Sequence, residues 1–397
     1  MTRSPLVLAF SGGLDTSFLI PYLKEKTGQP IVAAYVNTGG LETSQHASLI
    51  EKALALGARE AKIVDARRSF YDDIVTHLIR GNVLRGDVYP LCVGAERVTQ
   101  CKELVRVAKD VGAKDVAHGS TSAGNDQIRF EVGLSVLAPE LRILAPVRDE
   151  AFRREDEVAY LQKLGFSFSM ERSKYSVNRG LWGTTIGARS FQDPANPIDD
   201  EAWTAFDPNL APRAIEIGFR AGLPVSLDGE PLDGVTLVER VAALGASYGI
   251  GRGIHIGNTI MGIKGRIAFE APAATILLTA HRELEKLTLT HWQTTWKKTL
   301  SEFYGHMLHQ GNYFEPALRD IEALLEKSSE RVEGTVRVRL FAESARVESL
   351  ESPYSMMSDR GATYGEESLS WNGEEARGFA KIRSVSQKIW KQAGGES

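Results

Sequence analysis

The sequence predicts an α/β protein: an N-terminal doubly wound parallel sheet, followed by a C-terminal α+β domain with a terminal oligomerisation helix. Up to about residue 166, short apolar runs alternate with segments of helical periodicity, which is typical of βαβ units. After that point the pattern becomes irregular and rich in Gly, Pro and Asp. The length of 397 residues also exceeds one average domain. We therefore predict domains at 1–166 and 167–370, with a helix and tail at 371–397.

The first part begins with an apolar run, Leu6 to Phe10, which predicts a buried strand. A glycine turn follows, and Asp15, Thr16 and Ser17 open a helix in which Pro21 is expected to cause a kink. The same alternation predicts the remaining elements of this sheet. They are strands at Ile31–Val36, Ala61–Asp65, Asp115–His118 and Arg142–Ala145, and helices at Thr43–Leu56, Arg67–Arg80, Ala95–Val111 and Gln127–Leu137.

The second part is expected to be irregular from Phe168 to Pro231, apart from strand-like stretches at Ala214–Phe219 and Pro224–Leu227. Its later patterns predict helices at Leu232–Ser247, Ala273–Glu285, Thr290–His309 and Pro316–Lys327, a glycine-rich loop at Gly249–Gly257 and a strand at Gly334–Leu340. Trp292 and Trp296 lie one helical turn apart and are expected to pack internally. Apolar residues at helical spacing between Glu375 and Gln392 predict a docking or oligomerisation helix.

The composition narrows the class of protein. Hydrophobic residues make up 43% and charged residues 25%, which is typical of globular proteins. A net charge of −4 argues against a nucleic-acid-coating protein. Cys92 and Cys101 have no metal-ligand or disulfide spacing, and no apolar run is long enough to cross a membrane. We therefore expect a cytoplasmic protein with no nucleic-acid or membrane partner and no protein-bound metal.

The turn after the first strand has the chemistry of a phosphate site. Gly12 and Gly13 carry no Cβ, so several backbone N–H groups can approach an anion, and the start of the helix adds its positive dipole end. Ser11, Thr16 and Ser17 can add hydroxyl donors. A plain βα turn with an N-cap would have the same residues, so turn chemistry alone is the alternative interpretation.

The kind of phosphate site follows from what the turn contains. It has neither the G-x-x-x-x-G-K-[ST] pattern nor G-x-G-x-x-G. The segment Ser11-Gly-Gly-Leu-Asp-Thr-Ser17 instead resembles the pyrophosphate loop (PP-loop) of the ATP pyrophosphatases. That resemblance implies a HUP-like nucleotide-binding domain, and an enzyme that splits ATP at the α-phosphorus and adenylates an oxygen of the acceptor.

A second polar stretch, Val116 to Phe130, follows a predicted strand, so it should lie at the same sheet edge. Its small residues allow close backbone approach, Asn125 and Asp126 offer oxygen acceptors, and Arg129 offers a fork for a carboxylate. The alternative is a solvated, capped helix start in which Asp126 and Arg129 form an ordinary ion pair.

The whole chain resembles the argininosuccinate synthase family. Besides the opening loop, the resemblance lies in blocks that keep their order along the chain: His118-Gly, Gly124-Asn-Asp-Gln-Ile-Arg-Phe-Glu131, Ala145-Pro-Val-Arg148, Tyr248-Gly-Ile-Gly-Arg252, Gly262-Ile-Lys-Gly-Arg266, Glu270-Ala-Pro and Gly378-Phe-Ala-Lys-Ile382. It implies ATP-dependent condensation of citrulline with aspartate through a citrullyl-adenylate, with release of AMP and pyrophosphate, by a homotetramer. Mg²⁺ would be held mainly through phosphates.

The resemblance also assigns residues. The ATP contacts would come from Ala9, Phe10, Ser11, Gly12, Gly13, Leu14, Asp15, Thr16, Ser17 and Gly119. Aspartate would be held by Thr121, Asn125 and Asp126, and citrulline by Tyr89, Asn125, Arg129, Ser176 and Thr185. Asp15, Asp126 and Arg129 would take part in catalysis.

Departures from the family pattern concentrate on the citrulline side. Where the family has a serine after Tyr89, this chain has Gly94. It has Gly257 in place of a glutamate before Asn258, and Phe269 in place of a tyrosine before Glu270. A lysine in the second loop is Ala123, and an asparagine after Ser176 is Gly180. Each lost hydrogen bond to a buried polar group costs about 1–3 kcal/mol. One alternative is therefore that the enzyme uses an acceptor substrate other than citrulline. His255 and Asn258 could instead supply substitutes.

Two further classes stay open as alternatives. A glutamine-dependent amide synthetase would need a cysteine nucleophile after Met1, and none stands there. An RNA-modifying or nucleotide-binding PP-loop protein would be expected to show a basic-aromatic stripe, which this acidic chain lacks.

Overall fold

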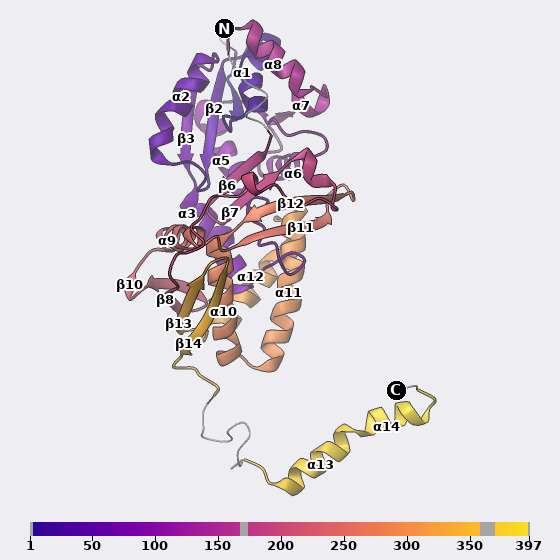
Figure 1. Ribbon diagram of the computed structural model, residues 1–397. Helices are drawn as coiled ribbons and strands as arrows, with labels where there is room; N and C mark the ends of the chain where they lie inside the picture. The colour runs from indigo at the N-terminus through magenta and orange to yellow at the C-terminus, as the bar shows by residue number, and fades with distance from the viewer. Residues whose placement is uncertain (1–2, 167–173, 358–369, 396–397) are drawn as a thin grey trace.

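The computed structural model describes residues 3–166, 174–357 and 370–395, and Figure 1 shows its arrangement. Its N-terminal part is built on a five-stranded parallel sheet of order β3-β2-β1-β4-β5. The strands are β1 (Leu6–Ala9), β2 (Ile31–Asn37), β3 (Glu60–Asp65), β4 (Asp115–Ala117) and β5 (Arg142–Leu144). The predicted parallel sheet is confirmed.

Both faces of this sheet are covered by helices, because its strands are apolar on both sides. Leu6 and Leu8 of β1 pack with α1, α2 and α8, while Val7 between them packs with α5 and α6. The helices of this part are α1 (Leu14–Thr27), α2 (His46–Ala55), α3 (Arg67–Phe70), α4 (Thr76–Arg80), α5 (Glu96–Val111), α6 (Asp126–Leu137), α7 (Pro146–Asp149) and α8 (Arg154–Lys163). Pro21 lies inside α1, which runs through it as one helix.

The segment predicted as one helix at Arg67–Arg80 is divided, since a π-helical turn at Tyr71–Val75 separates α3 from α4. Its apolar residues Phe70 and Ile74 pack with Ile217 and Val238 of the C-terminal part and not with the parallel sheet. The two halves of the chain therefore share a core.

The C-terminal part contains two antiparallel sheets, which fits the predicted α+β class. One has the order β11-β12-β7-β6 and the other β10-β9-β8-β13-β14. The first consists of β6 (Ser176–Gly180), β7 (Gly183–Gly187), β11 (Arg252–Asn258) and β12 (Lys264–Glu270). The second consists of β8 (Arg213–Arg220), β9 (Leu223–Leu227), β10 (Glu230–Pro231), β13 (Gly334–Phe341) and β14 (Ser344–Glu351).

Several expectations for this part are wrong. The stretch predicted as irregular contains β6 and β7, and residues 168–173 of it lie outside the described residues. The predicted loop at Gly249–Gly257 becomes β11 from Arg252 onward, because it pairs with β12 over seven residues. Glycine hides this strand from sequence analysis, since it weakens strand propensity and tertiary pairing overrides it.

The helices of this part are α9 (Gly234–Ser247), α10 (Pro272–Thr288), α11 (His291–His309), α12 (Pro316–Ser329), α13 (Gly373–Arg383) and α14 (Val385–Gln392). Trp292 and Trp296 on α11 are 70% and 62% exposed, so the expected internal packing is wrong for the single chain. Figure 1 shows α13 and α14 standing apart from the body, and their apolar residues, such as Ile382 and Ile389, are exposed.

None of the helices in the described part of the chain combines the length and apolar character needed to cross a bilayer.

Candidate functional site

The opening loop joins β1 to α1 and forms a compact turn at the carboxyl end of the sheet. Gly12 has a φ of +76°, a conformation that side chains rarely adopt, and a Cβ there would lie 2.6 Å from Leu49 Cδ1. The Ser11 hydroxyl lies 3.0 Å from Thr16 Oγ1, and Thr16 Oγ1 also accepts a hydrogen bond from the Ser11 backbone N–H. The turn is thus held by its own hydroxyl groups.

A lysine reaches this loop from a different element. Lys52 on α2 donates a hydrogen bond from Nζ to the Gly12 carbonyl over 2.5 Å. Burial lowers the pKa of Lys52, which marks it as a partly desolvated cation. The loop motif carries no lysine, so sequence reasoning missed this residue. Only the packing of α2 against the loop brings it there.

A buried carboxyl pair lies at the start of α1. Glu157 of α8 contacts Asp15, and burial together with the Asp15 charge raises the pKa of Glu157 to about 8. Glu157 is therefore protonated at neutral pH and can donate a hydrogen bond to Asp15. Nothing in the sequence near Glu157 indicated this contact.

The second predicted loop lies against the first. A Cβ on Gly119 would fall 3.1 Å from Thr16 Cγ2 and 3.5 Å from Asp15 Cβ. This proximity arises because β4 and β1 are neighbours in the parallel sheet, so their carboxyl ends share one edge. The predicted ATP residues Ala9–Ser17 and Gly119 are therefore brought together.

Asp126 is the centre of a charged cluster at the start of α6. Its carboxylate accepts from Arg97 Nη2 at 2.9 Å and from Arg129 Nη1 at 2.7 Å. Burial would raise the pKa of Asp126, but the two guanidinium groups outweigh it and hold the pKa well below its usual range. Sequence reasoning expected the Asp126–Arg129 pair and missed Arg97, which α5 supplies.

Arg129 also contacts α11. Its Nε donates to the His309 carbonyl at 2.9 Å, and its Nη2 lies 3.0 Å from His309 Nδ1. Burial and the charge of Arg129 lower the pKa of His309 to about 3, so this ring is neutral at physiological pH. His309 was not among the predicted site residues, because α11 lies far from α6 in the sequence.

Two other predicted residues have different surroundings from those expected. Asn125 Oδ1 accepts a hydrogen bond from the Ile260 backbone N–H at 2.8 Å, which ties the β11–β12 turn to α6. Thr121 lies in an exposed turn, closed by a hydrogen bond from the Gly124 N–H to the Thr121 carbonyl. The Asn125 amide group and the Thr121 hydroxyl stay available for a ligand.

Three of the predicted citrulline residues, Tyr89, Ser176 and Thr185, share one side of the β11-β12-β7-β6 sheet. Strand register puts Thr185 opposite Phe269 on β12 and opposite Asn178 on β6. Ser176 lies two residues before Asn178, so Ser176, Thr185 and Phe269 face the same way. Thr185 is buried and Ser176 is exposed. Tyr89 joins this side by packing on Phe269, with ring centroids 5.3 Å apart.

Glu96 fills the space that Gly180 leaves. A Cβ on Gly180 would fall 1.4 Å from Glu96 Oε1, while Glu96 Oε2 accepts from the Thr38 hydroxyl at 2.8 Å. Burial raises the pKa of Glu96 to about 8, although Arg97 opposes this shift. The space beside Gly180 is therefore occupied by a carboxyl group from α5, which lies 84 positions earlier in the chain and could not be paired with it by sequence pattern.

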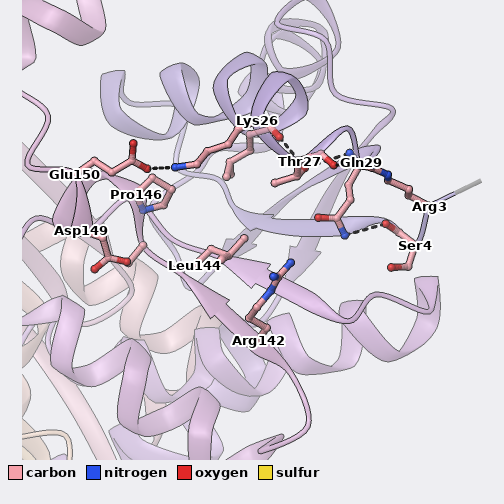
Figure 2. Close-up of a pocket in the computed structure, with 12 residues that line it drawn as sticks. Arg3, Ser4, Lys26, Thr27, Gln29, Arg142, Leu144, Pro146, Asp149 and Glu150 are labelled. Carbon is pink, nitrogen blue, oxygen red and sulfur yellow. Dashed lines mark hydrogen bonds and ion pairs between the residues drawn. The ribbon is translucent and has the colours of Figure 1, made fainter.

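A cavity of about 740 Å³ lies away from this site (Figure 2). Its walls come from the start of β1, the end of α1 and the β5–α7 segment, and include Arg3, Lys26, Arg142 and Glu150. Lys26 and Glu150 form an ion pair across it. None of its lining residues is a predicted site residue.

Among the described residues, no group of three or more His, Cys, Asp or Glu side chains could hold a metal ion. The acidic side chains of the loop region are instead engaged with each other or with arginines. The donor set therefore suits a divalent cation carried by nucleotide phosphates, with few ligands from the protein.

Comparisons with known proteins cover nearly the whole chain. The family model described as the arginosuccinate synthase N-terminal HUP domain matches residues 5–167, and that of the arginosuccinate synthase C-terminal domain matches residues 175–390. The chain is 38% identical over 392 residues to the argininosuccinate synthase of Crocosphaera subtropica, with 98% of both chains covered. It is 39% identical to that of Symbiobacterium thermophilum, again with 98% of both covered. It is 37% identical to that of Dictyoglomus turgidum, with 100% of both covered.

Proposed function

Because the chain belongs to the argininosuccinate synthase family, it is an ATP-dependent ligase of arginine biosynthesis, and we propose that its site joins citrulline to aspartate through a citrullyl-adenylate. The observation that carries this proposal is the contact of Gly119 with Asp15 and Thr16, which places the second loop beside the phosphate loop. The residues that we assign to the nucleotide and to aspartate would then lie at one sheet edge, as transfer of an adenylyl group requires.

The phosphate loop would hold the β- and γ-phosphates through its backbone N–H groups, the start of α1 and the hydroxyls of Ser11, Thr16 and Ser17. Lys52 adds a positive charge to the same loop. Mg²⁺, when bound, would neutralise phosphate charge, and Asp15 would be the carboxylate that contacts its water shell. The ureido oxygen of citrulline attacks the α-phosphorus, and pyrophosphate leaves.

The second step needs an amine that is held and oriented. Asp126 is kept ionised by Arg97 and Arg129, so it can attract the α-amino group of aspartate and orient it once a proton has been lost. Thr121 and Asn125 would hold the rest of aspartate, and Tyr89, Arg129, Ser176 and Thr185 would line the citrulline side. AMP leaves as the new C–N bond forms. Positioning and charge neutralisation carry the catalysis, with no covalent intermediate on the protein.

We also propose a homotetramer. Large apolar side chains are exposed along one face of α11, at Trp292, Trp296 and Phe303, and again on α13 and α14, including Phe379 and Ile389. Exposed apolar surface of this kind marks interaction sites, and a closed assembly of identical chains would bury it. The buried, unpaired thiols of Cys92 and Cys101 suit a reducing compartment, so we place the protein in the cytoplasm.

The test is a pyrophosphate-release assay with purified protein, MgATP, citrulline and aspartate. We expect release only when both amino acids are present, one AMP for each pyrophosphate, and a product whose mass equals citrulline plus aspartate less one water. Release that requires aspartate and ignores every ureido compound offered would contradict the proposal. Tight binding of transfer RNA at moderate salt would favour the RNA-modifying alternative.

A further inference from the structure

Arg85 is a partly buried cation without a carboxylate partner. It lies in the loop after α4, and its Nη1 is 3.2 Å from His255 Nε2 while its Nη2 donates to the Asn258 carbonyl at 2.6 Å. Among the described residues, no carboxylate forms an ion pair with it. Guanidinium groups in such surroundings are usually paired with an anion, because an uncompensated charge is costly to desolvate.

A second guanidinium lies nearby. Burial lowers the pKa of Arg85 most, and the positive charge of Arg129 lowers it further. The two guanidinium groups therefore repel each other across the site. Between them lie His255 and His309, whose pKa values are both lowered by burial first and then by these arginines. The two rings are therefore neutral at physiological pH and cancel none of the positive charge.

The ring of His309 adds an unused donor or acceptor. Its side chain is only 6% exposed, and its Nε2 makes no hydrogen bond of standard geometry, although the Asn258 backbone lies near enough to influence the ring. Buried polar atoms are nearly always satisfied, so this atom is open to a hydrogen bond with a ligand. The one ionised carboxylate of this cluster, Asp126, is already shared between Arg97 and Arg129.

Missing side chains make room for this arrangement. A Cβ on Gly257 would fall 2.4 Å from His255 Nε2 and 3.0 Å from Arg85 Nη1. A Cβ on Gly94 would fall 3.2 Å from Arg129 Cζ. Both guanidinium groups therefore occupy space beside glycines, and the altered positions on the acceptor side have made that side more positive.

Among the described residues, the strands of the sheet below these arginines contribute no carboxylate to this face. Register places His255 and Phe269 on one face, and the residues that share this face along the four strands are Gly253, Gly257, Gly265, Ile267, Gly183, Thr185, Gly187, Ser176, Asn178 and Gly180. Tyr89 closes it by stacking on His255, with ring centroids 5.5 Å apart. The strands give this face aromatic rings and neutral polar groups. The carboxyl group that reaches it beside Gly180, that of Glu96, has a pKa raised by burial to about 8 and so offers no anion to an ammonium group at neutral pH.

We infer that this enzyme reads the carboxylate end of its ureido substrate through Arg85 and Arg129 and does not require an ammonium group beside that carboxylate. It therefore also ligates aspartate to ureido carboxylates whose α-nitrogen is absent or acylated. This inference rests on the proposed function and concerns the acceptor range of the same site.

The chemistry is unchanged at the reacting end. The ureido oxygen forms a bond to the α-phosphorus as the bond to pyrophosphate breaks. The aspartate amine then bonds to the ureido carbon and loses a proton, while AMP leaves with the former ureido oxygen. Nothing is oxidised or reduced, and the α-nitrogen of the acceptor takes no part.

The experiment compares three acceptors with the full chain, MgATP and aspartate: citrulline, 5-ureidopentanoate, which lacks only the α-amino group, and butylurea, which lacks the carboxylate as well. We expect kcat/KM for 5-ureidopentanoate to lie within tenfold of that for citrulline or above it, and butylurea to be more than tenfold poorer than both. A 5-ureidopentanoate value more than tenfold below citrulline would overturn the inference and leave the proposed function standing. No aspartate-dependent pyrophosphate release with any acceptor would overturn both.

Arg85→Gln supplies the second arm, since it keeps a polar side chain and removes the charge. We expect at least a tenfold rise in KM for 5-ureidopentanoate, with KM for ATP unchanged and with butylurea turnover unaffected. Arg68→Gln, at an exposed arginine paired with Asp72, is the matched control. An equal loss with all three acceptors would show a structural role and count against the inference, and so would an unchanged KM.

Discussion

At the scale of single residues, Asp126 concentrates the most charge in the site. It holds two guanidinium groups that arrive from α5 and α6, so it serves both the fold and the proposed handling of aspartate. The Asp126–Arg129 pair lies within one helical turn, whereas the Arg97 contact depends on how α5 packs on α6.

Asp126→Asn tests this role. The amide keeps the shape but no longer neutralises Arg97 and Arg129, so we expect aspartate-dependent turnover to fall by about 100-fold or more, with ATP affinity within about threefold. Pyrophosphate-release kinetics and nucleotide titration measure the two quantities. Asp149→Asn, at an exposed acid paired with Arg148, is the control, and normal turnover in Asp126→Asn would remove this residue from the mechanism.

Glu96 makes the stability of the fold depend on pH. Burial raises the pKa of its carboxyl group to about 8, so the folded chain keeps a proton that the unfolded chain releases near pH 4–5. The unfolding free energy attributable to Glu96 is therefore full below about pH 4 and is lost as pH rises to about 8.

We expect Glu96→Gln to remove part of that slope, at most about 1.4 kcal/mol per pH unit. Urea unfolding at pH 5, 6.5 and 8 measures it. Glu157, whose pKa is also raised, contributes equally to both proteins and cancels in the difference. Glu103→Gln, on the same helix, is the control because Glu103 pairs with Arg106 near the surface. Equal slopes in wild type and Glu96→Gln would refute the assignment.

At the scale of elements, the β1–α1 turn depends on one backbone conformation. Gly12 needs a φ of +76° and has Leu49 of α2 where a Cβ would go, while Lys52 of the same helix holds the Gly12 carbonyl. The turn and α2 therefore form one unit, and a change in Gly12 disturbs the place where phosphates would bind.

We expect Gly12→Ala to reduce pyrophosphate formation by at least about tenfold and to cost about 1 kcal/mol or more of stability through backbone strain and the Leu49 contact. Gly112→Ala is the matched control, since Gly112 has a φ of +66° with no atom within 4 Å of the added Cβ. Gly112→Ala should lose a similar amount of stability through backbone strain and keep its activity. ATP affinity equal to wild type in Gly12→Ala would disprove the phosphate assignment.

At the scale of the whole molecule, the chain leaves large apolar side chains exposed on α11, α13 and α14, and Figure 1 shows the last two helices away from the body. Helices α13 and α14 bury none of their residues within a single chain. A second copy would supply the missing contacts, which is why we propose the tetramer.

Removing residues 371–397 should therefore convert the tetramer to a smaller species in sedimentation-velocity experiments. Ile389→Asp should weaken the assembly in the same direction, because it puts a charge into apolar contact surface. Gln387→Asp, two positions earlier in α14, is the control. An unchanged sedimentation coefficient for the truncated chain would contradict the role given to this helix.

The sequence by itself determined the N-terminal sheet and the glycine turn after β1. Strongly apolar β1 and β2 alternate with helices in local pattern, and Ser11–Ser17 forms its turn from its own residues. The division at 1–166, 167–370 and 371–397 stays a prediction. The Asp126–Arg129 pair was also predictable, because residues three apart on a helix are neighbours.

Tertiary structure alone decided which charged groups surround the predicted nucleotide and acceptor residues. Lys52 beside Gly12, Glu157 beside Asp15 and Glu96 in the space at Gly180 are contacts between elements distant in sequence, which local periodicity does not record. The strand β11 was missed for a related reason, since its glycines lack strand propensity and only pairing with β12 orders them. Local sequence thus determined the turn to which we assign phosphate binding, whereas long-range packing set the charges around that turn and around Gly180.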